Sequence, residues 1–185
     1  MTAPHDRWVG EILDFWFIQI DPAQWFGQSD ELDREVRERF AAHHAHAAVR
    51  PLRECLLDAR MALAVVVALD QFPRNMFRGT PRAFATDAKA LEVAERAVAQ
   101  GFDGQLTLNE RMFLYMPYEH AEDATAQARG LPLFQSLGDA EITRWAVEHK
   151  EIIDRFGRFP HRNAILGRTS TPDELAFLAE PGSSF

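Results

Sequence analysis

Residues 59–71 read ARMALAVVVALDQ and carry apolar side chains around nearly the whole circumference of a helix. A helix that is apolar on every side is buried, so we predict that this segment is the central helix of the protein, with Asp58 as its N-cap. The β-branched run Val65–Val67 would also suit a strand, but no turn-bounded partner strand lies nearby. Pro73 is expected to end the helix.

Helical periodicity continues on both sides of this segment. Trp8, Ile12 and Trp16 form an i, i+4, i+8 row that predicts a first helix ending near Gln19. Apolar spacing and capping residues predict the other helices. These are expected at 30–46 after Ser29, from Thr86 or Asp87 to Gly101, from Thr107 to Met116, from Pro117 to Arg129 before Gly130, from Asp139 to Gly157, and from Thr171 to about Ala179.

No segment shows convincing strand alternation, and no linker-like composition divides the chain. We therefore predict an all-α fold of seven to eight helices packed as antiparallel helical hairpins, forming a single domain over residues 1–185.

Composition narrows the possible classes of protein. The 185 residues carry a formal net charge of -8, which argues against a general nucleic-acid binder. The lone Cys55 cannot form an internal disulfide, as expected of a cytoplasmic protein. The longest apolar run, residues 61–69, is too short to cross a membrane, and the N-terminus lacks a signal pattern. No diagnostic metal or cofactor motif is present, so we predict neither a metal nor a cofactor.

Two segments resemble each other. Residues 72–81 read FPRNMFRGTP and residues 159–172 read FPHRNAILGRTSTP. Each follows an apolar helix with Phe-Pro and Arg-Asn, and each ends with Thr and Pro where another helix can begin. Asparagine and glycine suit a tight reversal of the chain, and a following helix presents free N–H groups to an anion.

If the two turns meet in space, their arginine and asparagine side chains would surround one cleft suited to a carboxylate or phosphate. The candidate ligand-binding residues are Arg74, Asn75, Arg78, Arg162, Asn163 and Arg168. The alternative is structural: the arginines bind the last carbonyls of the preceding helices, or pair with acids such as Asp70 and Asp154.

The run MPYEHAED, residues 116–123, is a second candidate site. If Pro117 begins a helix, Glu119 and Glu122 share one face, and His120 and Asp123 share the next. A histidine beside carboxylates suits acid–base chemistry or a ligand contact. The same set could also ligate a metal, although no second ligand cluster has diagnostic spacing. The same acids would also complement the dipole of a first helical turn without any further role.

The segments 69–91, 113–123 and 149–178, together with EILDFWF at 11–17, resemble the bacterial domain-of-unknown-function family 924. The resemblance spans nearly the whole chain. It implies an all-helical fold related to the tetratricopeptide-like superfamily, although no clean 34-residue period is visible. It implies no reaction, cofactor or catalytic residue.

These observations favour a small anionic ligand in an Arg/His/Glu-lined cleft, with Tyr118 as a further ligand contact. His120 or His161, oriented by Glu119, is the acid–base candidate. His149, on the apolar face of its helix, is either a core histidine or a residue of that cleft. The alternative function is a protein-interaction module with an exposed apolar groove; a third possibility is that the charged turns only tie helices together.

Overall fold

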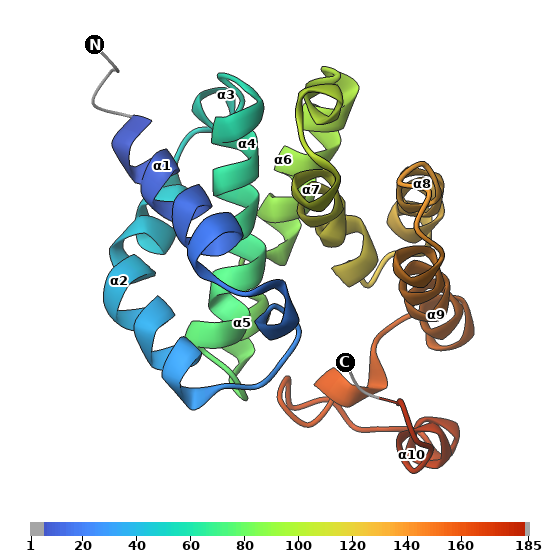
Figure 1. The fold of residues 1–185 in the computed structure, drawn as a ribbon. Coiled ribbons are helices and arrows are strands. Elements are labelled where there is room, and N and C mark those ends of the chain that lie inside the picture. Colours follow the sequence, from blue (N-terminus) through green and yellow to red (C-terminus); the bar gives the residue numbers. More distant parts are fainter. Residues whose placement is uncertain (1–5, 184–185) are drawn as a thin grey trace. The chain divides into compact units, whose positions relative to one another are not determined.

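The computed structural model describes residues 6–183, and within this range it contains helices and turns but no strand. The all-α prediction is confirmed. The chain forms two compact units (Figure 1): unit 1 comprises Met1–Arg78 and Arg82–Pro117, and unit 2 comprises Gly79–Pro81 and Tyr118–Phe185. The prediction of a single domain stays a prediction, and each unit is described by itself.

Unit 1 is built around one central buried helical segment. Its helices are α1 (Asp6–Asp14), α2 (Asp30–Val49), α3 (Leu52–Cys55), α4 (Ala59–Val66), α5 (Phe72–Met76), α6 (Asp87–Ala99) and the larger part of α7 (Leu108–His120). Short 3-10 and π turns connect them: η1 (Phe15–Gln19), η2 (Pro22–Gln24), η3 (Val67–Gln71), η4 (Pro81–Phe84) and η5 (Phe102–Gln105).

The central helix lies where the sequence predicts it. Residues 61–73 are all buried, and α4 packs against α1 and α6. Trp16 is completely buried, with its ring 5.7 Å from that of Phe72 and 5.6 Å from that of Phe113. Burial of such large aromatic side chains supplies much of the driving force for folding.

The prediction that Pro73 ends this helix is wrong. A π-turn, η3, precedes the proline, and the Phe72 N–H donates to the carbonyl of Val67. The wider turn lets the chain accommodate the proline near the start of α5, which continues to Met76. The local preference of proline is thus overcome by a change in helical pitch.

Unit 2 contains a helical hairpin. The hairpin consists of α8 (Ala124–Gln135) and α9 (Ala140–Phe156), which pack together (Figure 1). Gly138 reverses the chain between them with a φ of 72°, a conformation that glycine adopts without steric penalty. Beyond α9 lie η6 (Pro160–Arg162) and α10 (Pro172–Leu178). Ile152, Ile153 and Phe159 form a small core, against which Phe156 and Phe177 pack.

The predicted helix break at Pro117 is also wrong. Helix α7 runs through Pro117 to His120, and residues 112–119 are all buried. An interior proline costs a helix about 3 kcal/mol, so packing of the buried stretch outweighs the local preference. The next helix begins after Asp123, whose Oδ1 accepts a hydrogen bond from the Ala126 N–H at 2.7 Å. Gly130, predicted to follow a helix, lies inside α8.

Candidate functional site

Residues 72–78 of the first of the two similar turns lie in unit 1, where acids surround both arginines. Arg74 Nη1 and Nη2 each lie 3.0 Å from a carboxylate oxygen of Asp87. Nη1 also donates to the backbone oxygen of Asp70 and lies 3.3 Å from its Oδ1. Burial opposes the charge of Arg74, but Asp70 and Asp87 overcome this effect, and the pKa of Arg74 is raised.

Asn75 and Arg78 of the same turn bind one carboxylate. Arg78 Nε and Nη2 donate to Asp33 at 2.6 and 2.8 Å, and Asn75 Nδ2 donates to Asp33 Oδ1 at 2.8 Å. Burial is the largest single influence and favours the neutral acid, yet the hydrogen bonds from Arg78 and Asn75, together with nearby positive charges, outweigh it and lower the pKa of Asp33. We call this arrangement the Asp33 clamp.

The second turn, in unit 2, contains a similar clamp. Arg168 Nη1 and Nη2 donate to Glu122 at 2.6 and 2.9 Å, and Arg168 Nε donates to Asn163 Oδ1 at 2.9 Å. Glu122 also accepts the Phe159 N–H at 2.7 Å. Burial raises the pKa of Glu122, but Arg168 and the Phe159 N–H lower it by more. We call this the Glu122 clamp.

The similarity of the two turns therefore has a structural meaning. In each, a buried asparagine adjoins an arginine that binds a carboxylate through two nitrogens. Such bidentate pairs are geometrically specific. Arg74, Asn75 and Arg78 lie in unit 1, whereas Arg162, Asn163 and Arg168 lie in unit 2. That these two sets form one cleft stays a prediction.

Glu119 and His149 form a buried acid–histidine pair in unit 2. Glu119 Oε1 lies 2.8 Å from His149 Nδ1, and both side chains are less than a tenth exposed. The same Nδ1 lies 2.9 Å from the backbone oxygen of Trp145, one turn earlier in α9. Because a carbonyl oxygen can only accept, Nδ1 carries a hydrogen, and in the neutral ring the lone pair is on Nε2.

Around this pair, further basic side chains gather at the ring of Phe159. The His149 ring centre lies 5.6 Å from that of Phe159, the His161 ring centre also lies 5.6 Å from it, and the guanidinium carbon of Arg162 lies 4.6 Å above its face. The His120 ring centre is 6.3 Å from that of His149. We call His120, His149, Phe159, His161 and Arg162 the Phe159 cluster.

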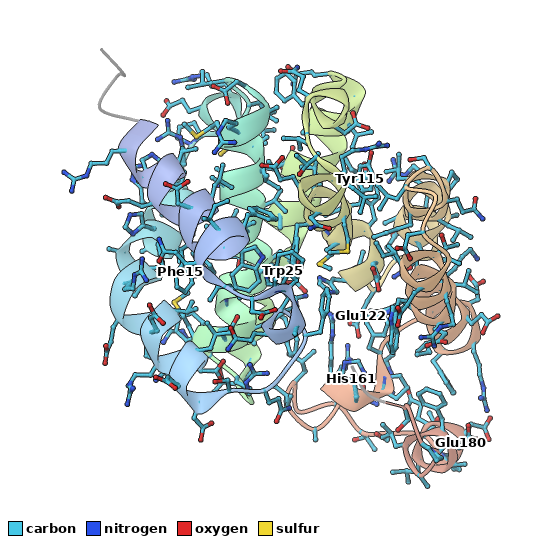
Figure 2. The ribbon with its side chains drawn as sticks, in the orientation of Figure 1. Phe15, Trp25, Tyr115, Glu122, His161 and Glu180 are labelled. Atoms are coloured by element: carbon cyan, nitrogen blue, oxygen red, sulfur yellow. The ribbon has the colours of Figure 1, made fainter. Side chains whose placement is uncertain are left out.

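The pKa of His161 reports the electrostatics of this cluster. Burial, then the nearby Arg162 and His149, lower that pKa from 6.5 to about 4. Glu122 opposes the shift, and Figure 2 shows its side chain near that of His161. His161 is therefore neutral near pH 7, in surroundings that disfavour a further positive charge.

The geometry predicted for residues 116–123 needs correction. Because α7 ends at His120 and Asp123 caps α8, the pairs Glu119–Glu122 and His120–Asp123 do not share the faces of one helix. Glu119 binds His149 instead, and Glu122 binds Arg168. Tyr118, the other predicted contact residue, is buried against Gly130.

Two surface hollows lie away from all the predicted site residues. One, of about 320 Å³, is lined by Asp58, Ala59, Arg60, Gln105, Leu106 and Glu110 in unit 1. The other, of about 380 Å³, lies at the α8–α9 turn of unit 2 and is lined by Gln135, Gly138, Asp139, Ala140 and Thr143. Within residues 6–183, no group of three or more histidine, cysteine or acidic side chains is arranged to hold a metal ion.

The fold and the clamps define an all-helical protein whose loops are held by arginine–carboxylate pairs. Residues 12–182 match the family described as "Bacterial protein of unknown function (DUF924)", and the chain belongs to this family. It is 42% identical to a solved structure, a protein of unknown function from Agrobacterium tumefaciens. The match covers 92% of this chain and 96% of that one, with a TM-score of 0.87. No curated protein matches the chain.

Sequence reasoning missed the partnership of Glu119 with His149 and the place of Phe159. The sequence does contain one signal: His149 lies on the same face of α9 as the buried Ala146, Ile152 and Ile153. The inward direction of His149 was thus predictable, whereas its carboxylate partner, 30 positions earlier, was not.

Among residues 6–183, none of the helices combines the length and the apolar character that a membrane-spanning helix requires.

Proposed function

We propose that unit 2 binds a small anionic molecule, of the carboxylate or phosphate class, at the Phe159 cluster. The observation that carries this proposal is the gathering of Arg162, His149 and His161 around one buried aromatic ring, with His120 beside His149. Guanidinium groups bind carboxylates and phosphates through two parallel hydrogen bonds, and neutral imidazoles donate hydrogen bonds to anions.

The electrostatics of His161 support the same proposal. Burial is the largest cause of the lowered pKa of His161, and the charges of Arg162, His149 and His120 lower it further. The contribution of these charges corresponds to a positive local potential, which favours an anion. A bound anion is therefore expected to raise the pKa of His161.

In this proposal the arginines of the two turns have different roles. Arg168 and Arg78 hold carboxylates of their own units, so they shape the turns. Arg162 is buried, and its planar guanidinium stacks over an aromatic face. Arg162 is thus the principal anion contact.

The test is a titration of the full chain with sodium acetate and with inorganic phosphate, followed by histidine ring signals in NMR. Addition of an anion should shift the signals of His161 and His149, and Arg162→Gln should abolish the shifts. Arg155→Gln is the matched control, because Arg155 also lies over a phenylalanine ring, 4.6 Å above Phe156, but outside the cluster. Equal shifts in wild type and Arg162→Gln would contradict the proposal.

A protein-interaction module is the second candidate, and one feature of unit 1 favours it. Ile18 in η1 and Phe26 after η2 are 79% and 69% exposed. Contiguous patches of exposed apolar side chains are typical of contact surfaces, and this candidate requires Ile18 and Phe26 to belong to one such patch. Light scattering of wild type and of the double variant Ile18→Ser, Phe26→Ser tests this candidate: a larger mass for wild type alone would support it, and equal masses of one chain would count against self-association.

A further inference from the structure

The hollow of about 320 Å³ in unit 1 is lined by charged side chains of both signs. Asp58 and Arg60 lie at the start of α4, and Glu110 lies in the first turn of α7. Ala59 and Leu106 add apolar surface to the same lining. Pockets for small molecules commonly have volumes of about 300–1,000 Å³. The hollow therefore presents a cation, carboxylates and an apolar wall within the space that one small molecule would fill.

Arg60 keeps its hydrogen-bonding capacity for a ligand. Its side chain is 57% exposed, and its Nη1 lies 3.6 Å from Glu110 Oε1, which is too far for a hydrogen bond. Within residues 6–183 its guanidinium donates to no acceptor. The other oxygen of Glu110 accepts the N–H and the hydroxyl of Thr107, both at 2.9 Å. Glu110 thus attracts Arg60 while the guanidinium remains open to a carboxylate, which it can bind through two nitrogens.

Asp58 supplies the opposite charge. Its Oδ1 accepts the Met61 N–H at 2.8 Å and so caps α4. Its Oδ2 accepts no hydrogen bond from the part of the chain that the structure describes. An ammonium group can therefore donate to Oδ2 without disturbing the cap.

We propose that this hollow binds a free α-amino acid with an apolar side chain. The carboxylate of the ligand binds Arg60, and its ammonium group donates to Asp58 Oδ2. The apolar side chain packs against Leu106 and Ala59. A simple anion would be repelled by Asp58 and a simple amine by Arg60, so the lining favours a ligand that carries both charges. All the lining residues belong to unit 1, so this site is separate from the Phe159 cluster.

The test compares L-leucine with two derivatives that each lack one charge. NMR titrations of the full chain are followed by the backbone amide signals of residues 58–60 and 105–110. Leucinamide lacks the carboxylate, and acetyl-leucine lacks the ammonium group. We expect each derivative to bind about fivefold more weakly than leucine, the effect of one partly exposed charged contact. If leucine shifts none of these signals, the proposal is wrong.

Glycine tests the apolar contact. It carries both charges but has no side chain to bury, so it should bind more weakly than leucine. Equal affinities for glycine and leucine would contradict the packing against Leu106 and Ala59.

Two variants assign the charged contacts. Arg60→Gln should bind leucine and leucinamide equally. Asp58→Asn, which keeps a capping side chain, should bind leucine and acetyl-leucine equally. Arg53→Gln is the matched control, because Arg53 is also exposed and also lies 3.6 Å from a carboxylate oxygen, that of Glu54, but outside the hollow. Arg53→Gln should keep both preferences.

The remaining outcomes decide where leucine binds. A preference for leucine over leucinamide that survives in Arg60→Gln, or that is lost equally in Arg53→Gln, would overturn the role of Arg60. Arg162→Gln should leave the shifts of residues 58–60 and 105–110 unchanged, since the site does not depend on the Phe159 cluster. Loss of these shifts in Arg162→Gln would overturn the proposal.

Discussion

Gly130 of α8 lies directly against Tyr118 at the end of α7. A Cβ atom at Gly130 would lie 2.5 Å from the Cβ of Tyr118, closer than two carbon atoms approach without displacement of the chain. Because Tyr118 is buried, its side chain has little room to move away. The glycine thus permits the close approach of these two segments. Because Glu119 follows Tyr118 directly, this close approach also determines where Glu119 lies.

We therefore expect Gly130→Ala to destabilise the protein by about 1–2 kcal/mol. Alanine improves helix propensity by about 1 kcal/mol, but the overpacking is expected to cost more, up to about 3 kcal/mol. Gly10→Ala in α1 is the control, since a Cβ atom at Gly10 would meet nothing within 4 Å; it should stabilise by about 0.5–1 kcal/mol. Urea unfolding measures both changes. If Gly130→Ala stabilised the protein, Tyr118 would have moved aside at little cost in free energy.

Lys89 caps the C-terminal end of α2. Its Nζ donates to the backbone oxygens of Ala47, Ala48 and Arg50 at 3.0, 2.8 and 2.6 Å. Cations favour this end of a helix, and hydrogen bonds from charged groups contribute about 1.5–3 kcal/mol. Lys89→Met should therefore lower the free energy of unfolding, measured in urea, by about 2 kcal/mol.

The other lysine of the chain provides the control for this change. Lys150 pairs with Asp154 one turn away on the exposed side of α9, and such pairs contribute about 0.3–0.5 kcal/mol. Lys150→Met should therefore alter the free energy of unfolding only slightly. Equal losses for the two variants would mean that Lys89 does not cap α2.

Glu174 makes the stability of the protein sensitive to acid. Arg158 donates to its two oxygens at 2.6 and 2.8 Å, and the Thr171 N–H donates at 2.7 Å. These contacts lower the pKa of Glu174 from 4.5 to about 2. A carboxylate whose pKa is lower in the folded state stabilises the fold above pH 4.5, and this contribution is lost as the pH falls toward 2.

Glu174→Gln should therefore flatten the dependence of stability on pH between about 4.5 and 2, as measured by urea unfolding at a series of pH values. Asp173→Asn, at the exposed neighbouring position in α10, should leave this dependence unchanged. If stability depended on pH equally in Glu174→Gln and in wild type, Glu174 would not be the source of this acid sensitivity.

His161 should titrate far below an ordinary histidine. Its pKa is lowered to about 4 in the folded protein against 6.5 unfolded, so the unfolded chain takes up a proton first as the pH falls. The fold then loses stability between pH 6.5 and 4. Histidine NMR should place its titration near pH 4, and saturating acetate should raise it. Titration near 6.5 without any anion would show that the cluster is not positive.

Local rules predicted several helix starts but not how far some of the helices continue. Asp58, Asp139 and Thr171 accept the hydrogen bonds expected of N-caps, because capping depends on residues within one turn. Pro73 and Pro117 did not end their helices, because burial of the surrounding chain and a π-turn compensated for the missing donors. Propensity is a local quantity, and packing can outweigh it.

For the candidate site, too, local features were predictable from the sequence and long-range contacts were not. The sequence indicated that residues 72–81 and 159–172 form related turns. In each turn the side chain of an asparagine lies beside that of an arginine that binds a carboxylate: Asn75 with Arg78, and Asn163 with Arg168. It could not indicate which carboxylates these are. Asp33 and Glu122 lie far from their arginines in sequence, and no periodicity connects them. Nor could spacing assign Glu119 to His149, since only the packing of the end of α7 against α9 brings them together.

The two clamps also bear on the order in which the protein takes shape during synthesis. Asp33 precedes Arg78 by 45 positions and Glu122 precedes Arg168 by 46. In each case the acid leaves the ribosome first, and the arginine that fastens the loop arrives last. Each loop can therefore close as soon as its own arginine emerges, onto a carboxylate that is already in place on the nascent chain.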